Sequence, residues 1–164
     1  MNTSKINDWL ALVANVAVVG GILFLTIELR QNNALLRSES RQALIANDAM
    51  SLTTNVANTD VFARLVAGDS LSAEDQLRLS FMFALDLRNR EFEYFQYVNG
   101  LLDEETWSAY LSVIRINHSS ELGRRWWDQI GRTFVDPEFA DLVDRVLADA
   151  DPDETYSHMS TWAN

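Results

Sequence analysis

The stretch from Trp9 to Ile27 constrains the fold more than any other part of this sequence. Asn15 and Thr26 are its only polar side chains, and it contains no charged residue. A helix of this length rises roughly 28 Å, close to the thickness of a bilayer's hydrocarbon core. A cleaved signal peptide has a shorter apolar core and a small-residue exit site, and a buried core helix rarely runs this far without a charge. The stretch therefore predicts a transmembrane helix.

Basic residues on either side of this stretch predict its direction. Arg30, Arg37 and Arg41 follow it, whereas Lys5 and the terminal amine precede it. Because basic residues are retained on the cytoplasmic side, we expect the N-terminus outside and the C-terminal part of the chain in the cytoplasm. The chain should cross the cytoplasmic membrane once, with lipid as its surroundings.

Small residues recur every three or four positions along the predicted span, with one amide beside them. They are Ala11, Ala14, Asn15, Ala17, Gly20 and Gly21. Such a stripe lets a second helix approach closely, and an amide in hydrocarbon is better placed against protein than against lipid. Small residues are also common in any membrane helix. The stripe is thus either a contact with another membrane protein or a second copy, or an ordinary lipid-facing surface.

The remainder of the chain is strongly acidic and poor in metal ligands. Residues 46–164 hold 9 arginines against 21 acidic residues, a net charge of -12. Such a domain repels nucleic acid and anionic lipid headgroups, so we expect no nucleic-acid partner. There is no cysteine, and His118 and His158 are the only histidines, so thiolate and His-rich metal sites are excluded. We expect no metal and no cofactor.

Helical periodicity and capping residues predict an all-α fold, with the transmembrane helix continuing into a helical-bundle soluble domain. Cap signals favour helices over residues 61–67, 73–99 and 104–117, then from Ser120 and from Pro137. The resulting division is residues 1–8 as a flank, 9–27 as the span, 28–57 as a helical stalk, 58–148 as an acidic helical domain and 149–164 as a loosely ordered acidic tail.

The helix predicted over residues 73–99 is the longest periodic segment after the span. One of its faces carries Leu77, Phe81, Ala84, Leu85, Arg88, Phe92, Phe95 and Val98. An apolar stripe at this spacing is the side by which a helix usually packs on a core, so we expect this helix to be the spine of the domain.

A polar and aromatic cluster on the same helix allows two interpretations. Arg88, Glu91 and Tyr94 are three residues apart, and Trp107 on the next predicted helix can join them. A carboxylate beside a guanidinium and a phenol can bind an anionic or hydroxylated ligand. The same groups also form structural networks that hold neighbouring helices together.

Adjacent tryptophans further along the chain predict an interface. Trp126 and Trp127 point about 100° apart on a helix, so one can be buried while the other lies at the surface. We predict Trp127 as the surface residue of the pair, available for contact with a partner. The alternative is that both rings flank a broad apolar stripe, which suits Trp126 better than Trp127.

No catalytic motif is present in the sequence. It has no Gly-rich phosphate loop, no Gly-x-Ser-x-Gly elbow and no His-Glu-x-x-His pair. These absences favour a chain that is not an enzyme, with no catalytic residues to name.

Four short segments, together with the span, resemble a family of small bacterial single-span membrane proteins of unknown function. The segments are Ile-Glu-Leu-Arg-Gln-Asn from Ile27, Arg-Glu-Phe-Glu-Tyr-Phe-Gln-Tyr from Arg90, Gly-Leu-Leu-Asp-Glu-Glu-Thr-Trp from Gly100 and Arg-Arg-Trp-Trp from Arg124. The resemblance extends over residues 9–147. It implies a helical domain attached to the bacterial inner membrane and assigns no activity.

Two hypotheses of function follow from these features. The first is a non-catalytic accessory or assembly subunit of a larger membrane complex, or a self-associating scaffold, with other membrane subunits or itself as partner. The alternative is a membrane-anchored sensor or carrier that binds a small ligand between Arg88, Glu91, Tyr94 and Trp107.

Overall fold

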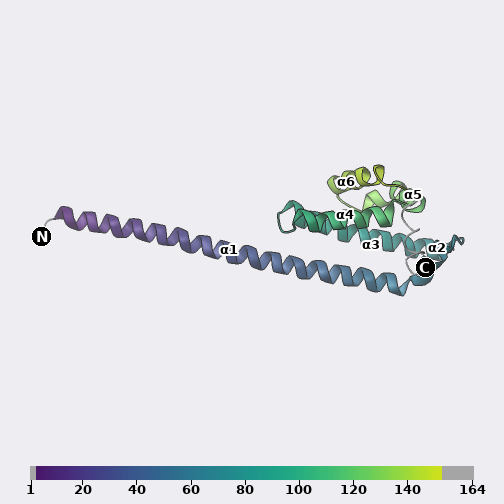
Figure 1. Ribbon diagram of the computed structural model, residues 1–164, viewed down its shortest axis with the longest axis horizontal. Coiled ribbons are helices and arrows are strands. Elements are labelled where there is room, and N and C mark those ends of the chain that lie inside the picture. The colour runs from purple at the N-terminus through teal and green to yellow at the C-terminus, as the bar shows by residue number, and fades with distance from the viewer. Residues whose placement is uncertain (1–2, 153–164) are drawn as a thin grey trace. The chain divides into compact units, whose positions relative to one another are not determined.

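A computed structural model describes residues 3–152 of the chain, with side chains from residue 6 onward. Within that range the chain forms six α-helices and one 3-10 turn, and no residue lies in a strand. The elements are α1 (Thr3–Ala57), α2 (Thr59–Ala67), α3 (Ala73–Val98), α4 (Glu104–His118), α5 (Glu121–Gln129), η1 (Gly131–Phe134) and α6 (Pro137–Ala148), shown in Figure 1. The predicted all-α fold, a long apolar N-terminal helix followed by a helical bundle, is confirmed.

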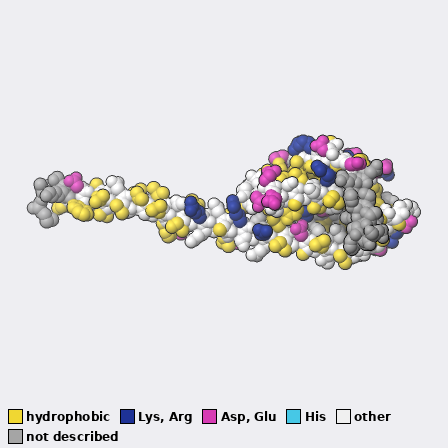
Figure 2. Space-filling model, in the orientation of Figure 1, with side chains coloured by type: hydrophobic (Ala, Val, Ile, Leu, Met, Phe, Trp, Pro, Cys, Tyr) yellow, Lys and Arg dark blue, Asp and Glu magenta, His cyan; other side chains and the backbone are white. Residues whose placement is uncertain are grey.

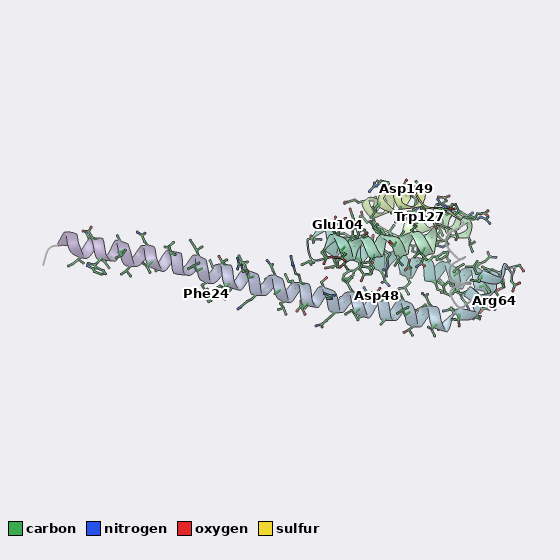
Figure 3. All side chains as sticks on the ribbon, viewed as in Figure 1. Phe24, Asp48, Arg64, Glu104, Trp127 and Asp149 are labelled. Atoms are coloured by element: carbon green, nitrogen blue, oxygen red, sulfur yellow. The ribbon has the colours of Figure 1, made fainter. Side chains whose placement is uncertain are left out.

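The chain divides into two compact units, residues 1–40 and residues 41–164. In the first unit every side chain from Ile6 to Glu39 is exposed, and hydrophobic side chains such as Phe24 project from all sides of the helix (Figures 2 and 3). Its most apolar window has a mean hydropathy of 2.5, which makes α1 a candidate membrane span by length and composition. The hydroxyl of Thr26 donates to the carbonyl of Ile22 at 2.8 Å, so this polar group is satisfied within the helix.

The stalk predicted over residues 28–57 is helical throughout but is divided between the two units. The compact helical unit begins at Arg41, so the last turns of α1 belong to the domain. Leu44 on this segment is buried, with only 4% of its surface exposed. The domain therefore includes one more helical segment than the range 58–148 contains.

Local capping chemistry explains where the helices of the domain begin and end. Ser72 and Asp75 form a reciprocal capping box at the start of α3, in which the Ser72 hydroxyl accepts from the Asp75 amide at 3.1 Å. Asp103, Ser120 and Asp136 cap α4, α5 and α6 through side-chain oxygens that each accept from one backbone amide of the first turn. Because these signals act within one turn, the predicted helix bounds agree with the structure to within two residues.

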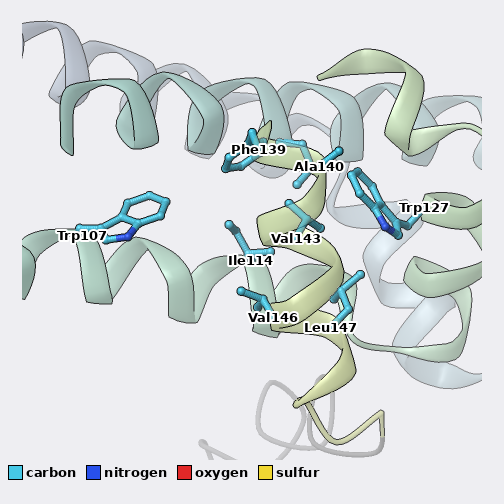
Figure 4. Packing of buried hydrophobic residues seen from close by; sticks show 9 residues of the cluster. Trp107, Ile114, Trp127, Phe139, Ala140, Val143, Val146 and Leu147 are labelled. Atoms are coloured by element: carbon cyan, nitrogen blue, oxygen red, sulfur yellow. The ribbon is translucent and has the colours of Figure 1, made fainter. Parts of the chain in front are cut away.

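The main core lies where α6 packs against α3, α4 and α5 (Figure 4). Phe139 and Val143 of α6 have no exposed surface, and the same holds for Leu87 of α3 and Ile114 of α4. A smaller cluster joins Val61 of α2 to Leu79 and Phe83 of α3. α3 contributes to both clusters and contacts α2, α4 and η1, so it is the central helix of the domain, as expected.

The first residues of the predicted tail are held by the domain. Arg124 donates to the carbonyl of Ala150 at 2.8 Å, and Ala150 is buried. The rest of the predicted tail, residues 153–164, lies outside the described residues.

Candidate interaction surface

The apolar stripe predicted to make α3 the spine of the domain lies on its outer face. Leu77, Phe81, Phe95 and Val98 expose 57%, 64%, 52% and 51% of their surface, whereas Leu85 and Phe92 are half-buried. Ala84 alone of the stripe is buried. The reason is that α3 carries a second stripe, Leu79, Phe83 and Leu87, which enters the two core clusters. The prediction that this stripe packs on the core is therefore wrong.

The side of α3 that faces α1 is mostly polar. Arg90 lies 3.1 Å from the carboxylate of Asp48, and the Asn89 amide donates to the Ser51 hydroxyl at 2.7 Å. Arg90 also lies over the ring of Tyr110, 4.8 Å from its centroid. The part of α1 after residue 40, where Figure 3 labels Asp48, thus makes polar contacts with the bundle in addition to burying Leu44.

Glu93 is fully buried in the same contact. Its Oε2 atom lies 3.1 Å from Nη1 of Arg90, yet neither oxygen has a hydrogen-bond partner among the described residues. Burial raises the pKa of Glu93 to about 8; Arg90 opposes this, and Asp48 and Asp86 add to it. The carboxyl is therefore predominantly protonated in the folded domain at neutral pH.

The half-buried Asp86 and the fully buried His118 form a second pair beside this cluster. Nε2 of His118 lies 2.9 Å from Oδ2 of Asp86, and His118 has no exposed surface. Burial alone would raise the pKa of Asp86, but the hydrogen bond and charge of His118, together with Arg90, hold it below its ordinary value. Among the described residues no group of three or more acidic and histidine side chains is arranged to hold a metal ion.

The residues predicted as a ligand site or structural network have partners of their own. Arg88 pairs with Glu91, and Glu91 also accepts from the backbone amide of Asp136. The Tyr94 hydroxyl donates to Glu138 at 2.7 Å. These bonds join α3 to the start of α6, which is the arrangement of a structural network.

Trp107, the fourth residue of that set, is part of the main core. It is 3% exposed, and its ring centroid lies 5.6 Å from that of Tyr94 and 5.5 Å from that of Tyr97. Trp107 therefore packs between aromatic rings of α3.

Trp127 is buried, which corrects the prediction that it lies at the surface. Only 2% of it is exposed, and its indole Nε1 donates to Asp144 of α6 at 2.8 Å. Trp126 turns to the other side, where its Nε1 donates to Ser80 of α3 at 2.8 Å. Because the two rings point to different sides of α5, Trp127 is buried against α6 while Trp126 is half-buried against α3.

An open groove of about 300 Å³ lies between α1, α2 and α3. Its walls are mostly apolar and include Leu52 and Val56 of α1, Phe62 of α2, and Met82 and Leu85 of α3. Asp86, Asn117, Ser51, Asn55 and Thr59 supply its polar atoms. Asp86 is the only ionisable side chain among these lining residues.

Sequence reasoning did not identify the groove or the buried polar cluster. Asp86 and Arg90 are four apart on one helix, which is a signal for a pair. Their partners Asp48 and His118 lie far away in the sequence, and no local pattern joins them. The sequence does indicate that Ile45, Leu52 and Val56 form one apolar line along α1, because they are spaced seven and four residues apart.

A comparison of the chain with protein-family models, with curated proteins and with solved structures finds no match. The resemblance to small bacterial single-span proteins therefore stays an expectation from the sequence segments alone.

Proposed function

We propose that this chain is a non-catalytic single-pass membrane protein that acts as a self-associating scaffold or as an accessory subunit of a larger membrane complex. One observation carries the proposal: the central helix of the domain turns an apolar face outward, with Phe81 64% exposed. Contiguous exposed apolar surface of this kind marks sites of protein contact. An interaction protein uses such a surface, whereas an isolated soluble domain gains nothing from it.

The apolar helix within α1 supplies the membrane attachment in this proposal. It enters the bacterial inner membrane from the outside, and the acidic domain lies in the cytoplasm, as the basic residues Arg30, Arg37 and Arg41 favour. The small-residue stripe with Asn15 provides a second contact inside the bilayer.

The proposal is tested by the mass of the full chain extracted from its native membrane in a mild detergent. We expect a protein mass above the 18.6 kDa of one chain, either a multiple of it or a sum with co-purifying subunits. A particle that contains one chain and no other protein contradicts the proposal.

A pair of variants then locates the contribution of the membrane helix. At Gly20 an added Cβ meets no atom within 4 Å, so Gly20→Leu leaves the single chain undisturbed but blocks close approach of another helix. Val19→Leu is the matched control, on the face of the same helix opposite the alanine and glycine residues of the stripe. Loss of mass with the first variant and not with the second supports contact through the stripe.

A second candidate function is the binding of a small ligand, and the groove favours it. A volume of about 300 Å³ lies at the lower end of the range of small-molecule sites. With apolar walls and the carboxylate of Asp86, the groove suits an amine that carries an apolar body. Titration of the full chain with n-hexylamine, followed by calorimetry, tests this function. Binding that Asp86→Asn removes supports it, and absence of binding contradicts it.

A further inference from the structure

Two neighbouring helices of the domain each present an apolar line to the outside. On α1 the line consists of Ile45, Leu52 and Val56, which expose 63%, 65% and 70% of their surface. On α3 it consists of Leu77, Phe81, Leu85, Phe92 and Phe95. Leu52, Val56 and Leu85 line the same groove, so the two lines meet there. We call this combined surface the α1–α3 face; Figure 2 shows hydrophobic side chains at the surface over this segment of α1.

Polar side chains lie between α1 and α3, and several of their apolar side chains lie at the surface. The contact between them contains Asp48, Arg90, Asn89 and Ser51 and the buried Glu93, while Ile45 of α1 and Phe81 and Phe95 of α3 are exposed at the surface. Helices normally bury the apolar side and expose the polar one. The α1–α3 face therefore has the character of a helix layer whose apolar partner is missing.

The apolar area of the face makes up most of what a stable protein contact requires. Six of its side chains, Ile45, Leu52, Val56, Leu77, Phe81 and Phe95, each expose more than half of their surface. With roughly 150 to 200 Å² for a fully exposed large side chain, they present about 600 Å² of apolar surface. A standard interface buries about 800 Å² on each partner, and about 600 Å² is the upper end of the largest apolar patch on a typical monomer.

The charge of the domain leaves this face as the one through which two copies of the chain can pair. Residues 46–164 carry a net charge of -12, so two such domains repel each other over most of their surfaces. Arg88 lies on the same face of α3 as this line, and Glu91 pairs with it. A partner selected by its basic charge would dock on the acidic surface, whereas two acidic domains can approach only through a face without net charge.

The position of Phe81 beside the groove suits a two-fold contact. Phe81 stands one helical turn before Leu85, next to the groove but outside its lining. A two-fold contact places the same surface patch of each copy against the other. In such a contact the aromatic ring of each copy can enter the groove of its partner.

We propose that the α1–α3 face is the contact between two copies of this chain, with Phe81 of each copy seated in the groove between Leu52, Val56 and Leu85 of the other. The inference rests on the proposed function, since it names the partner of an interaction protein. Attachment of both copies to one membrane raises their effective concentration and favours the pairing.

The first test is the protein mass of the full chain in mild detergent, measured over a range of protein concentrations by sedimentation. We expect twice 18.6 kDa for the unmodified chain. Phe81→Glu should raise the dissociation constant of the dimer by at least about 30-fold, as for an aromatic hot spot. Because Phe81 is mostly exposed, this variant should keep the fold, which near-UV circular dichroism of the buried tryptophans checks. The matched control is Ile130→Glu, another exposed apolar residue outside the face, with an unchanged dissociation constant.

The second test uses the absence of cysteine from the chain. A Phe81→Cys variant in native membranes should form a dimer with a short bis-maleimide cross-linker, and an Ile130→Cys variant should not. Cross-linking of the first variant alone supports the inference by a route that does not depend on a destabilised contact.

The possible failures separate the inference from the proposed function. A single-chain particle with no co-purifying protein overturns both. An unchanged mass for Phe81→Glu, with no cross-linking of Phe81→Cys, overturns the inference and leaves assembly through the membrane helix, which Gly20→Leu then disrupts. If Phe81→Glu releases a different protein from the particle, the face binds another subunit and the inference is wrong.

Discussion

Replacing Glu93 with glutamine should remove a pH-dependent loss of stability from the domain. The carboxyl is fully buried without a hydrogen-bond partner among the described residues, and burial raises its pKa from 4.5 to about 8. In the unfolded chain the group releases its proton near pH 4.5, whereas the folded domain retains it up to about pH 8. Between these values the folded state binds more protons, so the free energy of unfolding falls as the pH rises.

The size of the effect follows from the same shift. Each pH unit between the two pKa values costs about 1.4 kcal/mol, so the loss between pH 5.5 and pH 8 is roughly 3 kcal/mol. Glutamine has the same shape but does not titrate. The Glu93→Gln variant should therefore resemble the unmodified protein at pH 5.5 and be more stable than it at pH 8.

Urea unfolding of the full chain in a nonionic detergent, followed by tryptophan fluorescence, measures this difference at the two pH values. Trp107 and Trp127 are buried and report on the core. Glu121→Gln is the matched control, since that side chain is 87% exposed and lies at the start of α5. If Glu93→Gln loses as much stability as the unmodified protein between pH 5.5 and pH 8, the carboxyl is not held protonated by burial and the reasoning is refuted.

Three further substitutions test the packing and capping of the domain by the same unfolding measurement. Phe139→Ala should cost about 3 to 5 kcal/mol, because the ring is fully buried in the main core and leaves a cavity; a cost under 1 kcal/mol would show that the site collapses. Gly123→Ala should destabilise the domain by more than about 1 kcal/mol, because the new Cβ would lie 2.7 Å from the backbone oxygen of His118. Gly68→Ala is the comparison for backbone strain alone, because a Cβ there meets no atom but the residue has a φ of 75°. We expect this comparison variant to lose about 1 kcal/mol. Ser72→Ala should cost about 1 kcal/mol through loss of the capping box with Asp75, and an unchanged midpoint would contradict the role of that cap.

Local features of the sequence determined which residues form helices and where those helices end. The uncharged stretch within α1 and the absence of glycine and proline after it predict one long helix, because these signals act on the backbone turn by turn. Cap residues such as Ser72, Asp103 and Asp136 likewise place the helix ends, since each bonds to an amide within the next three residues.

Only the tertiary structure decided which sides of these helices meet. α3 carries two apolar stripes, and periodicity alone does not distinguish the one through Phe83 and Leu87, which enters the core, from the one through Phe81, which stays outside. Trp127 is buried because α6 covers it, and α6 is distant in sequence. The ion pair between Asp48 and Arg90 depends on the antiparallel approach of α1 and α3, a long-range contact that no local pattern encodes.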